Sequence, residues 1–137
     1  MKVLVDTSVW SLALRRHGRL DAAAVQELRL LIDAGRVAMI GPVRQELLSG
    51  VRTPESFATL REHLRGFADE PLVMADYERA AEHFNTCRAA GVQGSNTDFV
   101  ICAAAERRAL PILTTDRDFV RYAELLPIAL HGGAPDA

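Results

Sequence analysis

Short aliphatic runs alternate with longer amphipathic runs along this chain, and that alternation restricts the folds it can adopt. Strands are predicted over five segments: Lys2–Val5, Arg36–Ile40, Leu72–Met74, Pro111–Thr114 and Pro127–Ala129. Between them, apolar residues recur at helical spacing, as in Leu20–Ala34 and Tyr77–Ala90. Strands that alternate with helices are typical of α/β proteins. We therefore predict a central, mainly parallel sheet of four to five short strands, flanked by helices on both faces.

The chain has 137 residues, the length of one ordinary domain. We predict one domain over residues 1–130 and a flexible tail over residues 131–137. No apolar run is long enough to cross a bilayer and the first residues lack a secretory pattern, so we expect a cytoplasmic protein without membrane contact. Cys87 and Cys102 are isolated in the sequence and are expected to be reduced core residues. The net charge of −2 gives no basic signature of nucleic-acid binding.

Four acidic residues fall where the predicted elements would bring them to one edge of the sheet. Asp6 ends the first predicted strand, and Asp116 follows the fourth. Glu46 lies one turn into the helix after the second strand, and Asp98 opens a later helix. Ligands of open α/β sheets bind beyond the carboxyl ends of the strands. Because converging carboxylates repel one another, such a group attracts a hard divalent cation, and an all-oxygen set suits Mg²⁺ or Mn²⁺ better than zinc.

Each acid also has an ordinary structural explanation. Asp6 is suited to cap the helix that follows it, and a lone Glu46 is typical of a solvated helix residue. Ser95–Asp98 and Thr115–Asp118 both have the spacing of a capping box, and for Asp118 this capping role is favoured. Capping does not explain all the acids, because Glu46 is too far into its helix to cap it.

Four motifs spread over nearly the whole chain resemble those of PIN-domain ribonucleases, and within them the VapC-type toxins of bacterial toxin–antitoxin pairs. In order, they are VLVDTSVW, VRQELLSG, GSNTDFVICAAA and ILTTDRDF. The resemblance implies an acidic quartet of Asp6, Glu46, Asp98 and Asp116. Asp6 and Asp98 would bind Mg²⁺ directly, with Mn²⁺ as a possible substitute. Glu46 and Asp116 would complete the site directly or through water.

The resemblance also implies supporting residues around the quartet. Thr114 matches a hydroxyl position of the family pattern, and Ser8 and Asn96 are expected to orient carboxylates. No role is assigned to the additional acid Asp118. The candidates for contact with RNA or an antitoxin are Arg15, Arg16, Arg44 and Arg52. For each arginine, a solvated surface position is the favoured alternative.

A protein of this family would hydrolyse phosphodiester bonds in structured RNA of the tRNA or rRNA class, without a covalent intermediate. The family also implies a cognate antitoxin and a homodimer. One alternative is a catalytically inactive PIN-like binding module. A less favoured one is a phosphoaspartyl phosphatase or receiver. The phosphatase would need an acid where Ser8 stands, and the receiver needs a late lysine, whereas Lys2 is the only lysine.

Overall fold

The computed structural model describes residues 1–14 and 22–135. Its three strands are β1 (Val3–Val5), β2 (Val37–Ala38) and β3 (Ile112–Leu113). Seven helices lie in the described ranges: α1 (Thr7–Leu14), α2 (Ala23–Asp33), α3 (Gly41–Leu48), α4 (Pro54–Leu64), α5 (Met74–Ala89), α6 (Asn96–Arg108) and α7 (Asp118–Leu125). None of these helices is long and apolar enough to span a membrane.

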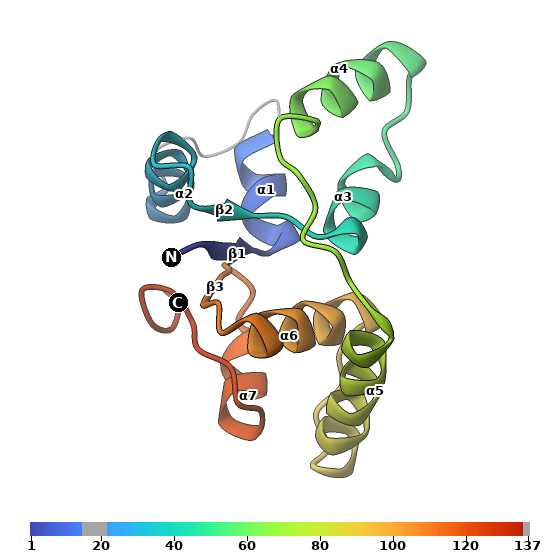
Figure 1. The fold of residues 1–137 in the computed structure, drawn as a ribbon, viewed down its shortest axis with the longest axis vertical. Coiled ribbons are helices and arrows are strands. Elements are labelled where there is room, and N and C mark those ends of the chain that lie inside the picture. Colours follow the sequence, from blue (N-terminus) through green and yellow to red (C-terminus); the bar gives the residue numbers. More distant parts are fainter. Residues whose placement is uncertain (15–21, 136–137) are drawn as a thin grey trace.

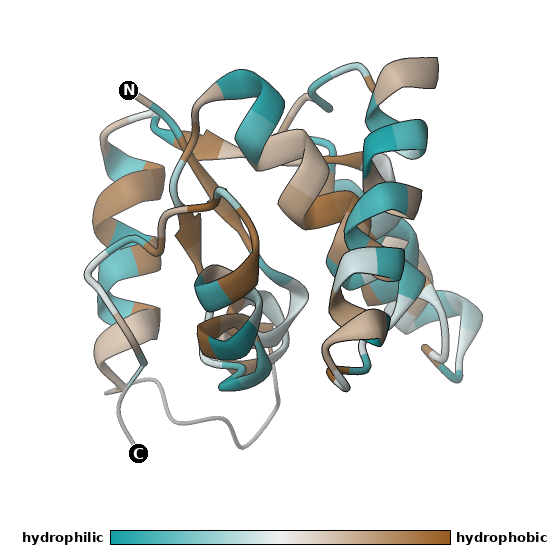
Figure 2. Ribbon diagram, turned by 90° about the horizontal axis from the view of Figure 1, so that it is seen from below, coloured by the Kyte–Doolittle hydropathy of each residue, from teal (hydrophilic) through white to brown (hydrophobic). Residues whose placement is uncertain are grey.

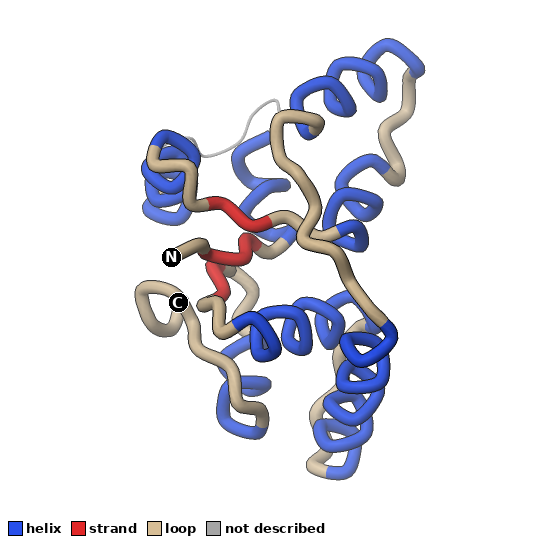
Figure 3. The backbone as a smooth tube through the Cα atoms, in the orientation of Figure 1, coloured by secondary structure: helices blue, strands red, loops and turns tan. Residues whose placement is uncertain are grey.

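The strands form a parallel sheet in the order β2-β1-β3. In the central strand, Leu4 is in register with Ala38 on one side and with Ile112 on the other. All three residues of β1 are buried, as expected for a parallel strand covered on both faces. Helices α1 to α4 lie to one side of the strands and α5 to α7 to the other (Figures 1 and 3). The predicted α/β class with a parallel sheet is confirmed.

The prediction of a strand over Leu72–Met74 is wrong. Without it, the sheet in the described part of the chain has fewer strands than the four to five expected. In the structure this segment leads directly into α5. The Val73 N–H donates to Asp76 Oδ2 at 2.8 Å and so caps the helix. An amide used in this way cannot join a strand ladder, so the described residues contain a sheet of only three strands.

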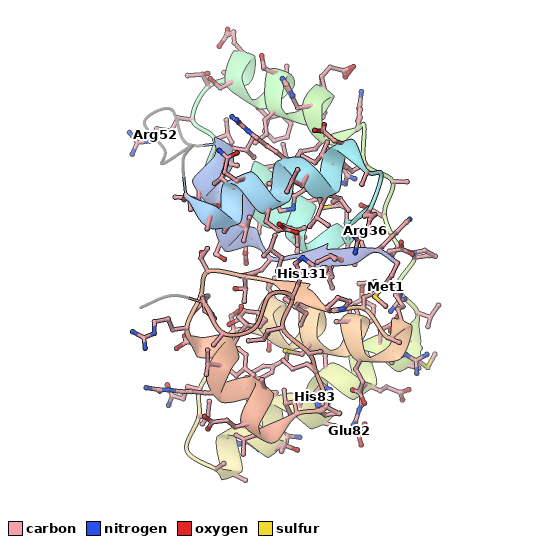
Figure 4. All side chains as sticks on the ribbon, turned by 90° about the vertical axis from the view of Figure 1, so that its left-hand side faces the viewer. Met1, Arg36, Arg52, Glu82, His83 and His131 are labelled. Carbon is pink, nitrogen blue, oxygen red and sulfur yellow. The ribbon has the colours of Figure 1, made fainter. Side chains whose placement is uncertain are left out.

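The predicted fifth strand over Pro127–Ala129 is also absent from the sheet. Pro127 has no N–H to donate to a ladder, and the contact with β3 is limited to one isolated parallel bridge between Ile112 and Leu130. The next residue, His131, donates its N–H to the Ile112 carbonyl at 2.7 Å. Its ring lies 2.9 Å from Glu27 of α2, and Figure 4 shows it near the middle of the molecule. The predicted domain limit at residue 130 and the flexibility of the tail remain predictions.

The core is built around α6, whose residues Phe99–Ala105 are all buried. Several of these residues are small, which lets α5 pack closely along one side of the helix while the sheet lies on another. Cys87 and Cys102 are free and buried, as predicted. Figure 2 shows apolar residues on the strands and alternating apolar and polar bands along the helices.

Ion pairs join α5 firmly to α6. Asp76, fully buried at the start of α5, accepts hydrogen bonds from Arg108 Nη1 and Nη2, both at 2.9 Å. These bonds hold the pKa of Asp76 well below its ordinary value. Further along, Glu106 accepts a hydrogen bond from Arg79 Nε at 3.0 Å and lies 2.7 Å from Nε2 of the buried His83 (Figure 4). Helix α6 is therefore anchored along its second half, away from its N-terminal acid.

Candidate active site

Asp6 is fixed where β1 gives way to α1. Its N–H donates to the Leu113 carbonyl at 2.9 Å, which continues the pairing with β3 by one residue. Its own carbonyl accepts the Val9 N–H at 3.1 Å in the first turn of α1. The Asp6 side chain is only 3% exposed. The backbone thus holds this buried carboxylate at the carboxyl end of the central strand.

Two hydroxyl groups hold the Asp6 carboxylate. Ser8 Oγ and Thr114 Oγ1 each donate to Asp6 Oδ2 at 2.7 Å. Ser8 Oγ accepts the Thr115 N–H at 3.1 Å, and Thr114 Oγ1 accepts the Asp116 N–H at 2.9 Å. Because each hydroxyl already accepts an amide hydrogen, its own hydrogen is free to point at the carboxylate. The structure thus places Ser8 and Thr114 against the Asp6 carboxylate, and their supporting role in a functional site remains a prediction.

Asp98 lies in the first turn of α6. Ser95 caps that helix, because its Oγ accepts the Asp98 N–H at 3.1 Å. Tyr122, a fully buried residue of α7, donates its hydroxyl to Asp98 Oδ2 at 2.7 Å. Sequence reasoning missed Tyr122, because its position fits the apolar face of an amphipathic helix. The available signal was that a buried tyrosine hydroxyl needs a polar partner.

Asp116 follows β3 and lies two residues before the start of α7. Its Oδ1 accepts the Asp118 N–H at 2.9 Å, and its carbonyl accepts the Phe119 N–H at 3.2 Å. The capping box predicted over Thr115–Asp118 is therefore wrong. Asp116 provides the side-chain cap, since the Thr115 N–H is directed to Ser8. Asp118 is exposed in the first turn of α7, a favourable position for an acid near a helix N-terminus.

The three aspartates influence one another electrostatically. Burial raises the pKa of Asp6, and repulsion from Asp116 adds to this, while the hydroxyls of Ser8 and Thr114 oppose it. Burial likewise raises the pKa of Asp98, and both Asp6 and Asp116 add to the increase. The structure thus brings Asp6, Asp98 and Asp116 into one acidic cluster, whose charge is unfavourable without a counter-ion.

The donors of this cluster fit a hard divalent cation. They are carboxylate oxygens backed by hydroxyl groups, which is the chemistry that Mg²⁺ and Mn²⁺ prefer. Within the described residues, no group of three or more acidic, histidine or cysteine side chains forms a cage that could hold a metal ion. Mg²⁺ ordinarily binds through one or two carboxylates and keeps several waters, so a closed cage is not required. Asp6 and Asp98 could hold such an ion, and their role as direct ligands remains a prediction.

Two predicted site residues are not joined to the cluster. Glu46 is exposed on α3, and among the described residues no hydrogen bond or ion pair connects it to the three aspartates. Asn96 is exposed at the start of α6, and no hydrogen bond to Asp98 is formed in the same part of the chain. Their predicted roles remain predictions.

The predicted arginine contacts have different surroundings. Arg15 and Arg16 lie outside the described residues. Arg44 is engaged within the fold: its Nε donates to Asp69 at 3.0 Å and its Nη1 to the Leu64 carbonyl at 2.9 Å. Arg52 is exposed and projects away from the body of the molecule (Figure 4). Of the arginines that the structure describes, Arg52 is thus more accessible to a partner than Arg44.

Comparison with known proteins shows the family to which this chain belongs. The PIN domain matches residues 3–125. The chain is 34% identical over 119 residues to ribonuclease VapC11 from Mycobacterium tuberculosis, covering 85% of this chain and 88% of the relative.

Solved structures have the same fold. VapBC2 from Rickettsia felis, bound to a DNA fragment from its promoter, matches with a TM-score of 0.75 and 19% identity, covering 96% of this chain and 98% of that chain. FitAcB from Neisseria gonorrhoeae matches with a TM-score of 0.70 and 20% identity, covering 93% and 95% of the two chains. The chain therefore belongs to the PIN-domain family, and within it to the group of VapC ribonucleases.

Proposed function

We propose that this protein is a Mg²⁺-dependent endoribonuclease that hydrolyses phosphodiester bonds in structured RNA of the tRNA or rRNA class. It would act in the cytoplasm as the toxin of a toxin–antitoxin pair. The observation that carries this proposal is the acidic cluster of Asp6, Asp98 and Asp116 at the carboxyl end of the sheet. Membership of a family with ribonuclease relatives supports the choice of reaction.

In the proposed reaction, the three aspartates of the cluster and Glu46 would form the metal site. Asp6 and Asp98 would hold the metal directly, and Asp116 and Glu46 would complete the site directly or through water. An ion held there would lower the pKa of a bound water and offset negative charge on the phosphate. One carboxylate of the cluster accepts the proton of the attacking water. Ser8 and Thr114 keep the Asp6 carboxylate in a fixed orientation.

An antitoxin partner is proposed on the same grounds. VapBC-5 from Mycobacterium tuberculosis is a member of the VapBC family of toxin–antitoxin systems and has the same fold, with a TM-score of 0.67. The acidic cluster would attract a basic side chain of such a partner as readily as a metal ion. A homodimer is proposed from the family resemblance alone.

Cleavage of purified tRNA and rRNA with Mg²⁺ or with EDTA tests the proposal. We expect cleavage by the unaltered chain only with Mg²⁺, and loss of cleavage in Asp6→Asn. Glu46→Gln should lower the rate by about 10- to 100-fold if this residue holds metal through water. Glu62→Gln is the matched control, because Glu62 is an exposed glutamate of α4. Cleavage that persists in EDTA or in Asp6→Asn would reject the proposal, whereas metal binding without cleavage would favour the inactive binding module.

A further inference from the structure

The hydroxyl of Tyr122 connects the last helix to the acidic cluster. It lies 2.7 Å from Asp98 Oδ2, although the two residues belong to different helices. Tyr122 is fully buried, whereas Asp98 is partly exposed. A hydrogen bond from a buried group to one oxygen of a carboxylate limits how the carboxylate can rotate. Because the carboxylate is planar, its other oxygen is restricted as well.

The ring of Tyr122 has little freedom to move. Its centroid lies 5.1 Å from that of Phe99 at an interplanar angle of 50°, and 5.1 Å from that of Phe119 at 70°. Such aromatic contacts fix both the position and the tilt of the ring. The hydroxyl is therefore held at Asp98 by packing as well as by the hydrogen bond.

Gly94 supplies the space that the hydroxyl occupies. A Cβ at this position would collide with the Tyr122 hydroxyl, and it would lie 2.8 Å from Tyr122 Cζ and 2.9 Å from Phe99 Cζ. The φ angle of Gly94 is not positive, so its backbone conformation does not by itself require glycine. The close approach of Tyr122 explains this glycine, and it ties the loop before α6 to the geometry of Asp98.

From this arrangement we infer that Tyr122 is a positioning residue, which sets how tightly the acidic cluster binds its divalent ion by fixing the Asp98 carboxylate. The inference rests on the proposed metal-dependent function. Groups that orient metal ligands in this way commonly change metal affinity by about 10- to 100-fold when they are removed. A purely structural role for the hydroxyl would instead affect stability and leave metal affinity unchanged.

Titration calorimetry with Mn²⁺ on the full chain tests the inference. Tyr122→Phe keeps the ring and removes only the hydroxyl, so we expect the Kd for Mn²⁺ to rise by about 10- to 100-fold. Tyr77→Phe is the matched control, because Tyr77 is the other tyrosine and is 51% exposed. Its Kd should stay within about twofold. In cleavage assays, higher Mg²⁺ should restore much of the rate lost in Tyr122→Phe, since the defect lies in metal binding.

Gly94→Ala provides an independent test that keeps the hydroxyl but displaces it. It should weaken Mn²⁺ binding in the unaltered chain. It should have little further effect on the Kd for Mn²⁺ in the Tyr122→Phe background, because the hydroxyl through which the displacement acts on Asp98 is then absent. Additive effects of the two changes would overturn the inference. The inference would also be overturned if the unaltered chain binds Mn²⁺ and Tyr122→Phe binds it with the same Kd. In that case the proposed function would stand. If the unaltered chain binds no Mn²⁺, the metal site itself fails, and this inference fails with it.

Discussion

Thr114 joins two members of the acidic cluster through one hydroxyl group. It donates to Asp6 Oδ2 and accepts the Asp116 N–H. Thr114→Val keeps the shape of the side chain but leaves that amide unpaired and removes one of the donors to Asp6. We expect RNA cleavage to fall by about 10- to 100-fold. Urea denaturation should show a loss of about 1–2 kcal/mol in the free energy of unfolding.

Thr59→Val is the control for this change, because the Thr59 hydroxyl donates to the Glu55 carbonyl of its own helix, α4. It should leave cleavage unchanged. If Thr114→Val cleaves RNA as fast as the unaltered chain, the hydroxyl does not orient the cluster.

Asp98 should make stability depend on pH when no metal is bound. Burial raises the pKa of Asp98, with repulsion from Asp6 and Asp116 adding to it, so the folded chain holds this proton more tightly than the unfolded chain. Ionisation of Asp98 therefore lowers the free energy of unfolding. This destabilisation is absent below the ordinary pKa near 3.8 and grows as the pH rises through the raised pKa. In EDTA at pH 7.5, Asp98→Asn should therefore melt roughly 3–5 °C higher, equivalent to about 1 kcal/mol.

Melting curves between pH 4 and pH 8 check this sign. The advantage of Asp98→Asn should shrink as the pH falls, while Asp33→Asn, at an exposed position of α2, should show no such trend. A variant that melts below the unaltered chain at neutral pH would show that the Asp98 charge is not unfavourable in the folded protein.

The acidic cluster could be predicted largely because strand ends and helix starts are visible in the sequence. Asp6, Asp98 and Asp116 each follow a signal of this kind, and the structure brings them together. Tyr122 could not be assigned, because its partner is 24 residues away and is set by how α7 packs on α6. The exposed position of Glu46 likewise depends on the orientation of α3, which helical spacing does not determine.

The junction of α5 and α6 depends on the buried carboxylate of Asp76. Arg108→Leu would remove two of its hydrogen bonds and leave a buried charge less well compensated. We expect a loss of about 3 kcal/mol in the free energy of unfolding at pH 7, measured by urea denaturation. Because the pKa of Asp76 is lowered in the folded chain, its contribution is present above the ordinary value of 3.8 and is lost as the pH falls through the lowered pKa. The deficit of the variant should therefore shrink in acid.

Arg65→Leu is the matched control for the α5–α6 junction. Arg65 pairs with Glu62 at 3.4 Å, but both side chains are largely exposed. Exposed pairs of this kind contribute about 0–1 kcal/mol. Equal losses in Arg65→Leu and Arg108→Leu would show that burial of Asp76 does not matter for the junction.

Helices were more predictable than strands in this fold. The apolar spacing of Tyr77–Ala90 corresponds to α5, which spans Met74–Ala89. The segment Leu72–Met74 has strand-like residues, yet the Asp76 carboxylate captures the Val73 amide and starts a helix instead. Such competition between a side chain and a strand ladder is decided by the tertiary fold and not by local composition.

The molecule as a whole places the cluster where its two groups of helices meet. Asp6 joins the central strand to α1, Asp98 lies in the first turn of α6, and Asp116 lies just before α7. Figure 1 shows α1 on one side of the strands and α6 and α7 on the other. Residues from the beginning and the end of the chain are thereby brought to one edge of a rigid sheet. A metal ion bound there would link both groups of helices, so metal binding should stabilise the entire fold.

The stabilisation of the fold by a metal ion at the acidic cluster is measured directly by the melting temperature of the antitoxin-free chain, with millimolar Mn²⁺ or with EDTA. An ion present at 100 times its Kd adds about 2.7 kcal/mol to the free energy of unfolding. For a domain of this size we predict a rise of roughly 5–15 °C, with most of it lost in Asp98→Asn. An unchanged melting temperature in the unaltered chain, or an equal rise in Asp98→Asn, would contradict a shared metal site built from these aspartates.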